Sequence, residues 1–234
     1  MTVAAVLLLV ACYALAMYLT WAQRTPIYLL ALVSGHLSAF ASPLWQLLYN
    51  VRYSEALSAV RYLIGQPIPL PVLLGAGWFY PLPALLVFFL YRVRWWFPGT
   101  LTGLLTYFVF LLYHLLIEAL GVRSSTWIYD GAALSFDLPP LLLSAIMAAL
   151  ISLGLLYTLI STWRYAGLSM LLAVLPATLL LSLIIHGLLG APLWVALLLD
   201  AQPWAAAIGL LSSLALLGWA IQIMTYGFSR LERN

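Results

Sequence analysis

The sequence predicts an all-α integral membrane protein, with about seven transmembrane helices in one bundle. Of its 234 residues, 66% are apolar and only 6% are charged, whereas a soluble domain carries about 25% charged residues on its water-facing surface. The apolar residues form unbroken runs of about 20, the length of a helix that crosses a bilayer. They do not alternate with polar residues, as membrane barrel strands do. We therefore expect helices, in which the backbone N–H and C=O groups form hydrogen bonds with one another inside the lipid.

Seven apolar runs define the predicted helices, which form a single transmembrane domain over 1–234. The first run has no basic residues before it, so it is expected to span the membrane rather than to be a cleaved signal peptide. Tryptophans fall at several of the predicted ends, as interfacial anchors do. The helices are placed at 2–22, 26–49, 72–93, 98–120, 139–161, 166–189 and 203–226.

Three connecting segments differ from the spans. Over 50–66, charged residues at helical spacing with apolar residues between them predict an amphipathic helix lying along the membrane interface. Pro67 and Pro69 end that helix. The loop 121–138 is polar enough to lie outside the lipid, and 191–202 is expected to be a second interfacial piece.

The arginines predict the orientation. All nine basic residues are Arg. With the N-terminus outside and the C-terminus in the cytoplasm, six arginines are cytoplasmic (Arg24, Arg92, Arg94, Arg164, Arg230 and Arg233) and three are outside (Arg52, Arg61 and Arg123). This excess favours N-out, C-in, because cytoplasmic loops are richer in basic residues.

Several functional classes are excluded by composition. Without any Lys, a retinal protein that needs a lysine Schiff base is ruled out. The scattered arginines argue against nucleic-acid binding, and the single cysteine, Cys12, allows neither an intrachain disulfide nor a Cys-based metal site. No cofactor or metal site is expected. The expected partners are the lipid bilayer and an apolar small molecule, and nothing in the sequence identifies a protein partner.

The helix over 98–120 carries the strongest catalytic candidates. Tyr107, His114 and Glu118 recur at spacings that place them on one face, and ionisable groups inside a membrane are functional candidates by default. We expect this face to point into the bundle. His114 and Glu118, four residues apart, would form a pair that holds and delivers a proton. The alternative is that both merely tie helices together by hydrogen bonds.

Other candidate groups gather toward the same, outer end of the bundle. They predict a pocket lined by aromatic side chains and a few titratable groups. As residues that contact the substrate we single out Tyr107, His186, Trp45, Glu55, Trp127 and Tyr129.

The segment from Glu118 through Gly121, Trp127 and Tyr129 to Pro139 resembles membrane carotenoid-biosynthesis proteins, namely the carotenoid hydratases and the small lycopene cyclases. Those families place an acidic residue at a helix end, then a Gly, an aromatic-x-aromatic loop and a Pro before the next helix. The likeness covers about 25 residues. The hydratase His is replaced by Ile117, and the paired glutamates of the cyclases by Leu141 and Leu142.

The segment His114-Leu-Leu-Ile-Glu118 is also similar to the His/Glu helix of the sterol isomerase (emopamil-binding) family. Both likenesses imply an acid that protonates an alkene in an aromatic cavity. The leading hypothesis is therefore a membrane hydratase, cyclase or isomerase that acts on an isoprenoid or lipid through Glu118, assisted by His114. The alternatives are a non-catalytic subunit or pigment- or lipid-binding scaffold, and a small transporter, whose broken helices Pro81, Pro83 and Pro176 would suit.

Overall fold

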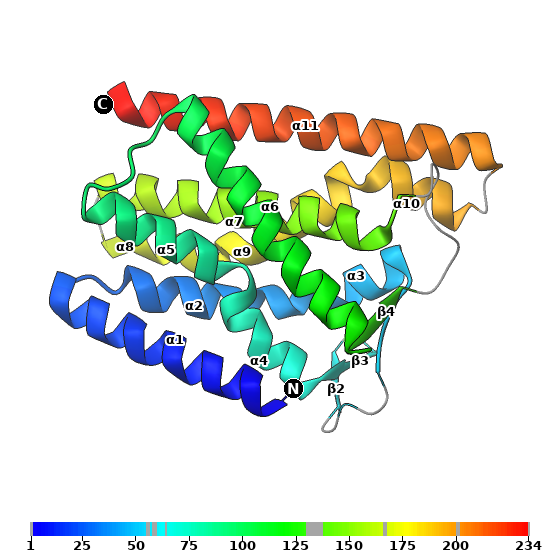
Figure 1. The fold of residues 1–234 in the computed structure, drawn as a ribbon, viewed down its shortest axis with the longest axis horizontal. Coiled ribbons are helices and arrows are strands. Elements are labelled where there is room, and N and C mark those ends of the chain that lie inside the picture. The colour runs from blue at the N-terminus through cyan, green and yellow to red at the C-terminus, as the bar shows by residue number, and fades with distance from the viewer. Residues whose placement is uncertain are drawn as a thin grey trace.

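The computed structural model describes residues 2–54, 57, 60–63, 65–129, 138–165, 168–199 and 202–233. These residues form a bundle of long helices that run side by side (Figure 1). Six helical segments are long and apolar enough to cross a membrane, and a bent pair, Val174–Leu189 with Ala191–Leu198, makes a seventh. The predicted fold class, an all-α multi-pass membrane protein with about seven spans, is confirmed.

The elements follow the predicted spans closely, with extra breaks inside them. The first half of the chain contains α1 (Thr2–Gln23), α2 (Ile27–Ser38), the 3-10 turn η1 (Ala39–Ala41), α3 (Ser42–Tyr49), α4 (Leu70–Phe79), α5 (Pro81–Arg92) and α6 (Thr100–Arg123). The second half contains α7 (Pro140–Tyr165), α8 (Leu168–Leu172), α9 (Val174–Ser182), the π-helical segment η3 (Leu183–Leu189), α10 (Ala191–Leu198) and α11 (Pro203–Arg233).

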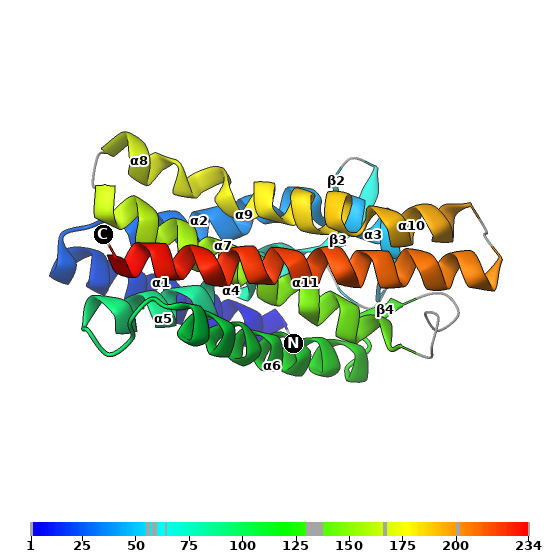
Figure 2. The ribbon, with the colours of Figure 1, turned by 90° about the horizontal axis from the view of Figure 1, so that it is seen from above.

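Helix α7 is the centre of the bundle. Over its spanning window 83% of the residues are buried, against 11% for α1 and 22% for α11. Figure 2, in which the bundle is seen from above, shows α7 behind α11 and between α9 and α6. The outer helices present leucine, valine and tryptophan side chains to the outside, which is the surface that lipid requires.

Small residues let α2 and α4 approach closely. A Cβ on Gly35 would lie 2.6 Å from the Ala76 carbonyl oxygen, and a Cβ on Gly77 would overlap the His36 ring. The imidazole of His36 lies 3.2 Å from the Leu73 carbonyl oxygen through Nδ1 and stacks on Tyr13. His36 therefore joins α1, α2 and α4, a structural role for this membrane histidine.

Two of the spans, the third and the sixth, are broken, the third of them near its middle. The third span divides at Tyr80, between α4 and α5, because Pro81 has no N–H to continue the helix. The sixth passes from α9 into the π-helical η3 and then bends by 58° into α10. That last piece falls within the short interfacial segment predicted at 191–202.

The predicted amphipathic helix at 50–66 is wrong. Its described residues include the strands β1 (Val51–Tyr53) and β2 (Val60–Leu63) and no helix; β2 pairs antiparallel with β3 (Gln66–Pro69). Strand β1 pairs antiparallel with β4 (Trp127–Tyr129), with Tyr53 opposite Trp127. A charged pattern over a short segment does not distinguish helix from strand, and this strand depends on a partner more than 70 residues away.

Candidate functional site

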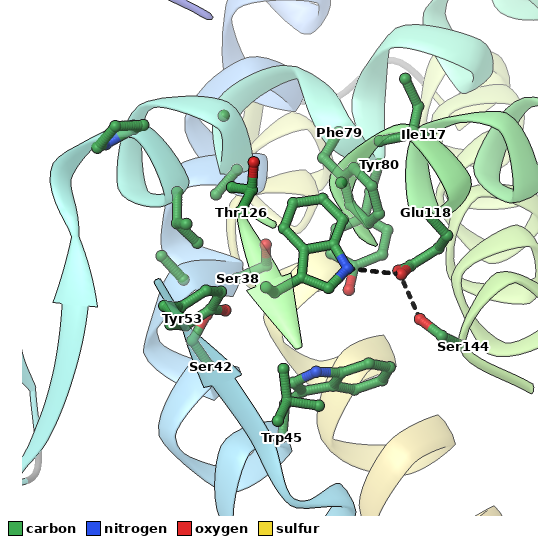
Figure 3. A pocket seen from close by; sticks show the side chains of 18 of the residues that line it. Ser38, Ser42, Trp45, Tyr53, Phe79, Tyr80, Ile117, Glu118, Thr126 and Ser144 are labelled. Carbon is green, nitrogen blue, oxygen red and sulfur yellow. Dashed lines mark hydrogen bonds between the residues drawn. The ribbon is translucent and has the colours of Figure 1, made fainter. Parts of the chain in front are cut away.

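A cavity of about 360 Å³ lies toward the end of the bundle that carries the β1–β4 ribbon (Figure 1). The residues of its wall come from α1, α2, η1, α3, β1, α4, α6, β4, α7, α9 and η3. Most of the lining is apolar or aromatic, and Glu118 is its single acidic side chain among the described residues. Figure 3 shows Glu118 on one side, with Trp45 and Tyr53 across from it. The arrangement is typical of a small-molecule site, which combines an apolar wall with a few polar groups.

Glu118 is held by three hydrogen-bond donors. The Ser144 hydroxyl donates to Oε1 at 2.6 Å. The Trp127 indole N–H and the Tyr129 hydroxyl donate to Oε2 at 3.0 and 2.8 Å. Glu118 is only 4% exposed, so water has little access to its carboxyl group. A buried carboxylate is tolerated because donors from α7 and β4 satisfy it.

The alternation of strand β4 explains two of these donors. Successive strand residues point to opposite faces, so Trp127 and Tyr129 both face Glu118, while Ile128 between them is exposed. Gly121, one turn after Glu118, makes the approach possible, because a Cβ there would overlap the Trp127 ring. The opposed strand contributes Val51 and Tyr53 to the cavity wall.

The phenols of the two strands stay protonated. Burial, together with the nearby Glu118 charge, raises the pKa of Tyr129 far above its ordinary value. Burial raises the pKa of Tyr53 to about 12. The Tyr129 hydroxyl is therefore a permanent donor to Glu118 at any pH the protein meets.

His186 and Trp45 form another part of the cavity wall. Their rings meet edge to face at 4.4 Å, and both line the cavity. His186 lies on the π-helical η3, a rare conformation that occurs frequently at functional sites. Two backbone carbonyl groups of this segment accept hydrogen bonds from side chains of other elements. The Tyr49 hydroxyl donates to the His186 oxygen at 2.8 Å, and the Trp194 indole donates to the Gly187 oxygen at 2.8 Å.

The inward-facing stripe on α6 is confirmed: Tyr107, His114 and Glu118 are all at most 4% exposed. The predicted proton-sharing pair is wrong, however. His114 Nε2 bonds the Ser152 hydroxyl at 2.8 Å, whereas Glu118 accepts its hydrogen bonds from Ser144, Trp127 and Tyr129. Residues four apart on a helix share a face but lie about 6 Å apart along its axis, and each found partners at its own depth.

His114 is a packing residue in this arrangement. Ser152 donates to the Tyr80 carbonyl oxygen at 3.0 Å, so its oxygen accepts from His114 Nε2–H. The imidazole lies among the rings of Phe79, Tyr80 and Tyr113. It supports the break between α4 and α5, and it is not among the residues that line the cavity.

Tyr107 also lies away from the cavity, contrary to the substrate-contacting role predicted for it. Its hydroxyl donates to the Ile146 carbonyl oxygen at 3.4 Å, between α6 and α7. The eleven positions that separate it from Glu118 correspond to about 16 Å along a helix. Glu55, the remaining predicted contact, lies outside the described residues, as do Asp130, Asp137 and Asp200.

Sequence reasoning missed Ser144 and Tyr53. Ser144 lies in the second turn of α7, among leucines and alanines, where one serine carries no signal. Tyr53 was hidden by the assignment of 50–66 to a helix. The alternation Val51-Arg52-Tyr53, matched to Trp127-Ile128-Tyr129, is a signal that could have identified both strands.

Comparison with protein-family models, with curated proteins and with solved structures gave no match to this chain.

Proposed function

We propose that this chain is a membrane enzyme that transfers a proton between the Glu118 carboxyl group and an apolar isoprenoid or lipid held in the cavity. The observation that carries the proposal is a buried carboxyl group, bound by three donors, in the wall of an otherwise apolar and aromatic cavity. Ionisable groups at such positions in membrane proteins are costly and mark functional sites. His114 is not part of the proposed mechanism, because it bonds Ser152 and does not line the cavity.

The hydrogen bonds favour Oε1 as the oxygen that carries the proton. The indole N–H of Trp127 can only donate, so Oε2 remains an acceptor. The Ser144 hydroxyl can rotate, donating to an ionised Oε1 and accepting from a protonated one. Glu118 therefore keeps all three partners in both states, as a group that cycles between acid and base requires.

Transfer of this proton to an alkene carbon forms a C–H bond and leaves a cation on the neighbouring carbon. The faces of aromatic rings attract cations, most strongly those of Trp, and Trp45, Tyr53 and Trp127 line the cavity. The cation then loses a different proton, giving an isomer, or gains water and releases a proton, giving an alcohol. Alternatively, a second double bond of the same chain attacks the cation, which closes a ring through a new C–C bond, and the new cation loses a proton. In each case a proton returns to Glu118 and the cycle closes.

The arginine distribution supports an orientation for this site. With the N-terminus outside, Arg52 in strand β1 and Arg123 at the end of α6 belong to the outer side. We propose that the cavity lies toward the extracytoplasmic leaflet. Thiol labelling from outside of a cysteine placed at exposed Ile128 tests this, and labelling only after the membrane is opened would reverse it.

Deuterium exchange tests the reaction. The protein in bilayer nanodiscs is incubated in D₂O with farnesol, geranylgeraniol or squalene, and deuterium at carbon is measured by mass spectrometry. Protonation from a deuterated carboxyl leaves a C–D bond in the product, whichever way the cation collapses. Glu118→Gln keeps the shape of the side chain and should lower incorporation by at least about 100-fold, the usual contribution of an acid–base group.

The matched control is Gln222→Glu, which adds a carboxyl group on α11 rather than in the cavity wall and should not raise incorporation. Undiminished incorporation by Glu118→Gln would remove Glu118 from the reaction. Isoprenoid binding by the wild-type protein without any exchange would favour the lipid-binding scaffold instead.

A further inference from the structure

Two of the residues that line the cavity also lie on the outer surface of the bundle. Of its lining residues, only Leu8 on α1 and Leu120 on α6 are exposed, at 37% and 51%. Ala5 and Ile117 also line the cavity, each three residues before one of these leucines and hence on the same helix face. We call these four residues the rim. Figure 1 shows the start of α1 and the end of α6 at the same end of the bundle, with α4 between them.

All four rim residues are apolar, and the rim lies on the flank of two helices that are long enough to span the membrane. Other exposed leucines, Leu112 and Leu116, continue the same side of α6. An apolar opening on such a flank faces lipid chains rather than water. A ligand that passes through it therefore comes from the bilayer.

The cavity is small for the ligands that a bilayer supplies. Its 360 Å³ equals the volume of about 12 water molecules at about 30 Å³ each. A terminal segment of an isoprenoid or acyl chain fits within this space, whereas a whole long isoprenoid or a diacyl lipid does not. The remainder of a long ligand must lie elsewhere.

We infer that the cavity takes one end of a long, linear isoprenoid or acyl chain, which enters across α4, past Leu8 of α1 and Leu120 of α6, while the rest of the chain stays in the bilayer. This inference rests on the ligand class of the proposed function but not on catalysis. It makes the bound chain end, beside Glu118, the place where chemistry occurs. A substrate is then recognised by its terminal group, and its total length is not limited by the cavity.

Two isoprenoid alcohols of different length test the inference. Geraniol (10 carbons) fits inside the cavity, and solanesol (45 carbons) cannot. Each is supplied in nanodiscs, and the alcohol bound per protein is measured by native mass spectrometry. The wild-type protein should bind both. Leu120→Trp narrows the rim and should lower bound solanesol by about ten-fold, a change of about 1.4 kcal/mol, with geraniol altered by less than about two-fold.

Leu116→Trp is the matched control, since Leu116 is exposed one turn earlier on α6 and is not in the cavity wall; it should alter neither ligand. Gly75→Leu defines the background, because Gly75 lines the cavity and a Cβ there meets only the Trp78 ring, at 3.9 Å. A leucine should fill the cavity and abolish specific binding of both alcohols.

Exclusion of solanesol by a wild-type protein that binds geraniol would show a closed cavity and overturn the inference. Solanesol binding that Leu120→Trp leaves unchanged would overturn the route past the rim. If neither alcohol binds, the inference fails together with the ligand class of the proposed function. Failure of catalysis alone is distinguishable, because both alcohols would then still bind without deuterium exchange.

Discussion

The charged side chains at the two ends of the bundle have different surroundings. At the cavity end, Glu118 receives three hydrogen bonds and still borders open space. At the opposite end, Arg92 is covered by side chains: its Nε–H donates to Gln23 Oε1 at 3.0 Å, and its guanidinium lies 3.5 Å from the centre of the Trp163 ring. Tyr28 also donates to Gln23 at 2.9 Å.

This difference indicates that Arg92 contributes to packing, whereas Glu118 is placed for a functional role. The contacts of Arg92 join α1, α2, α5 and α7, and the group has found partners from several helices at once. Such a cluster stabilises a bundle. Glu118 has equally good partners, but they leave one side of the carboxyl region facing a cavity, where a ligand can be placed. We therefore expect changes at one end to alter chemistry and changes at the other to alter stability.

The largest expected effect is that of Gly121→Ala at the cavity end. The added Cβ would overlap the Trp127 ring and displace the indole from Glu118. Misplacement of a catalytic group by about 1 Å can cost about 100-fold in rate, so deuterium incorporation should fall by that order. Gly218→Ala is the control, because a Cβ at Gly218 meets nothing within 4 Å.

A second variant, which removes only the indole donor, tests whether the effect of Gly121→Ala comes from loss of the Trp127 hydrogen bond. Trp127→Phe keeps an aromatic ring but has no N–H, so it should also slow exchange, without steric conflict. Full activity in both variants would show that the Trp127 bond has no part in holding Glu118.

At the opposite end, Arg92→Met should lower stability and spare activity. The change removes a charged hydrogen bond and a cation–π contact, together worth about 1–3 kcal/mol, while retaining an apolar stem. Unfolding by SDS in mixed micelles measures the loss, and deuterium incorporation by the remaining folded protein should equal that of the wild type. A loss of exchange without a loss of stability would connect the two ends and break the comparison.

The smallest effect is expected for His114→Leu. His114 lies on the same helix as Glu118 but, like Arg92, it is packed among other side chains. Loss of its bond to Ser152 should cost about 1 kcal/mol, with exchange changed by less than about two-fold because His114 does not border the cavity. SDS unfolding and the exchange assay measure the two quantities. A drop in exchange comparable to that of Glu118→Gln would restore the paired mechanism.

Hydropathy was sufficient for the spans, since the free energy of burying apolar side chains in lipid depends on local composition. The predicted 98–120 helix and α6 (Thr100–Arg123) agree within a few residues. The same pattern identified Glu118 as an inward-facing acid. The neighbours of each residue along the helix could not be predicted. Periodicity shows which residues share a face, but it does not show which side chains of other helices lie beside His114 or beside Glu118.

The parts that could not be predicted depend on contacts distant in sequence. The β1–β4 pairing and the Ser144 bond to Glu118 join segments that only tertiary structure brings together. The break at Tyr80 was different: Pro81 and Pro83 were recognised as helix breakers, but the aromatic side chain exposed to the cavity by that break could not be foreseen.

The β1–β4 ribbon also has a consequence for biogenesis. Val51 pairs with Tyr129, and α4, α5 and α6 lie between the two strands in the chain. During synthesis, residue 53 must wait for two further membrane crossings before its strand partner leaves the ribosome. Trp127 and Tyr129 follow Glu118 closely in the chain, so the acid and these two donors leave the ribosome together. The ribbon can therefore close only after α6 has been made, and it closes around an acid whose donors are already present.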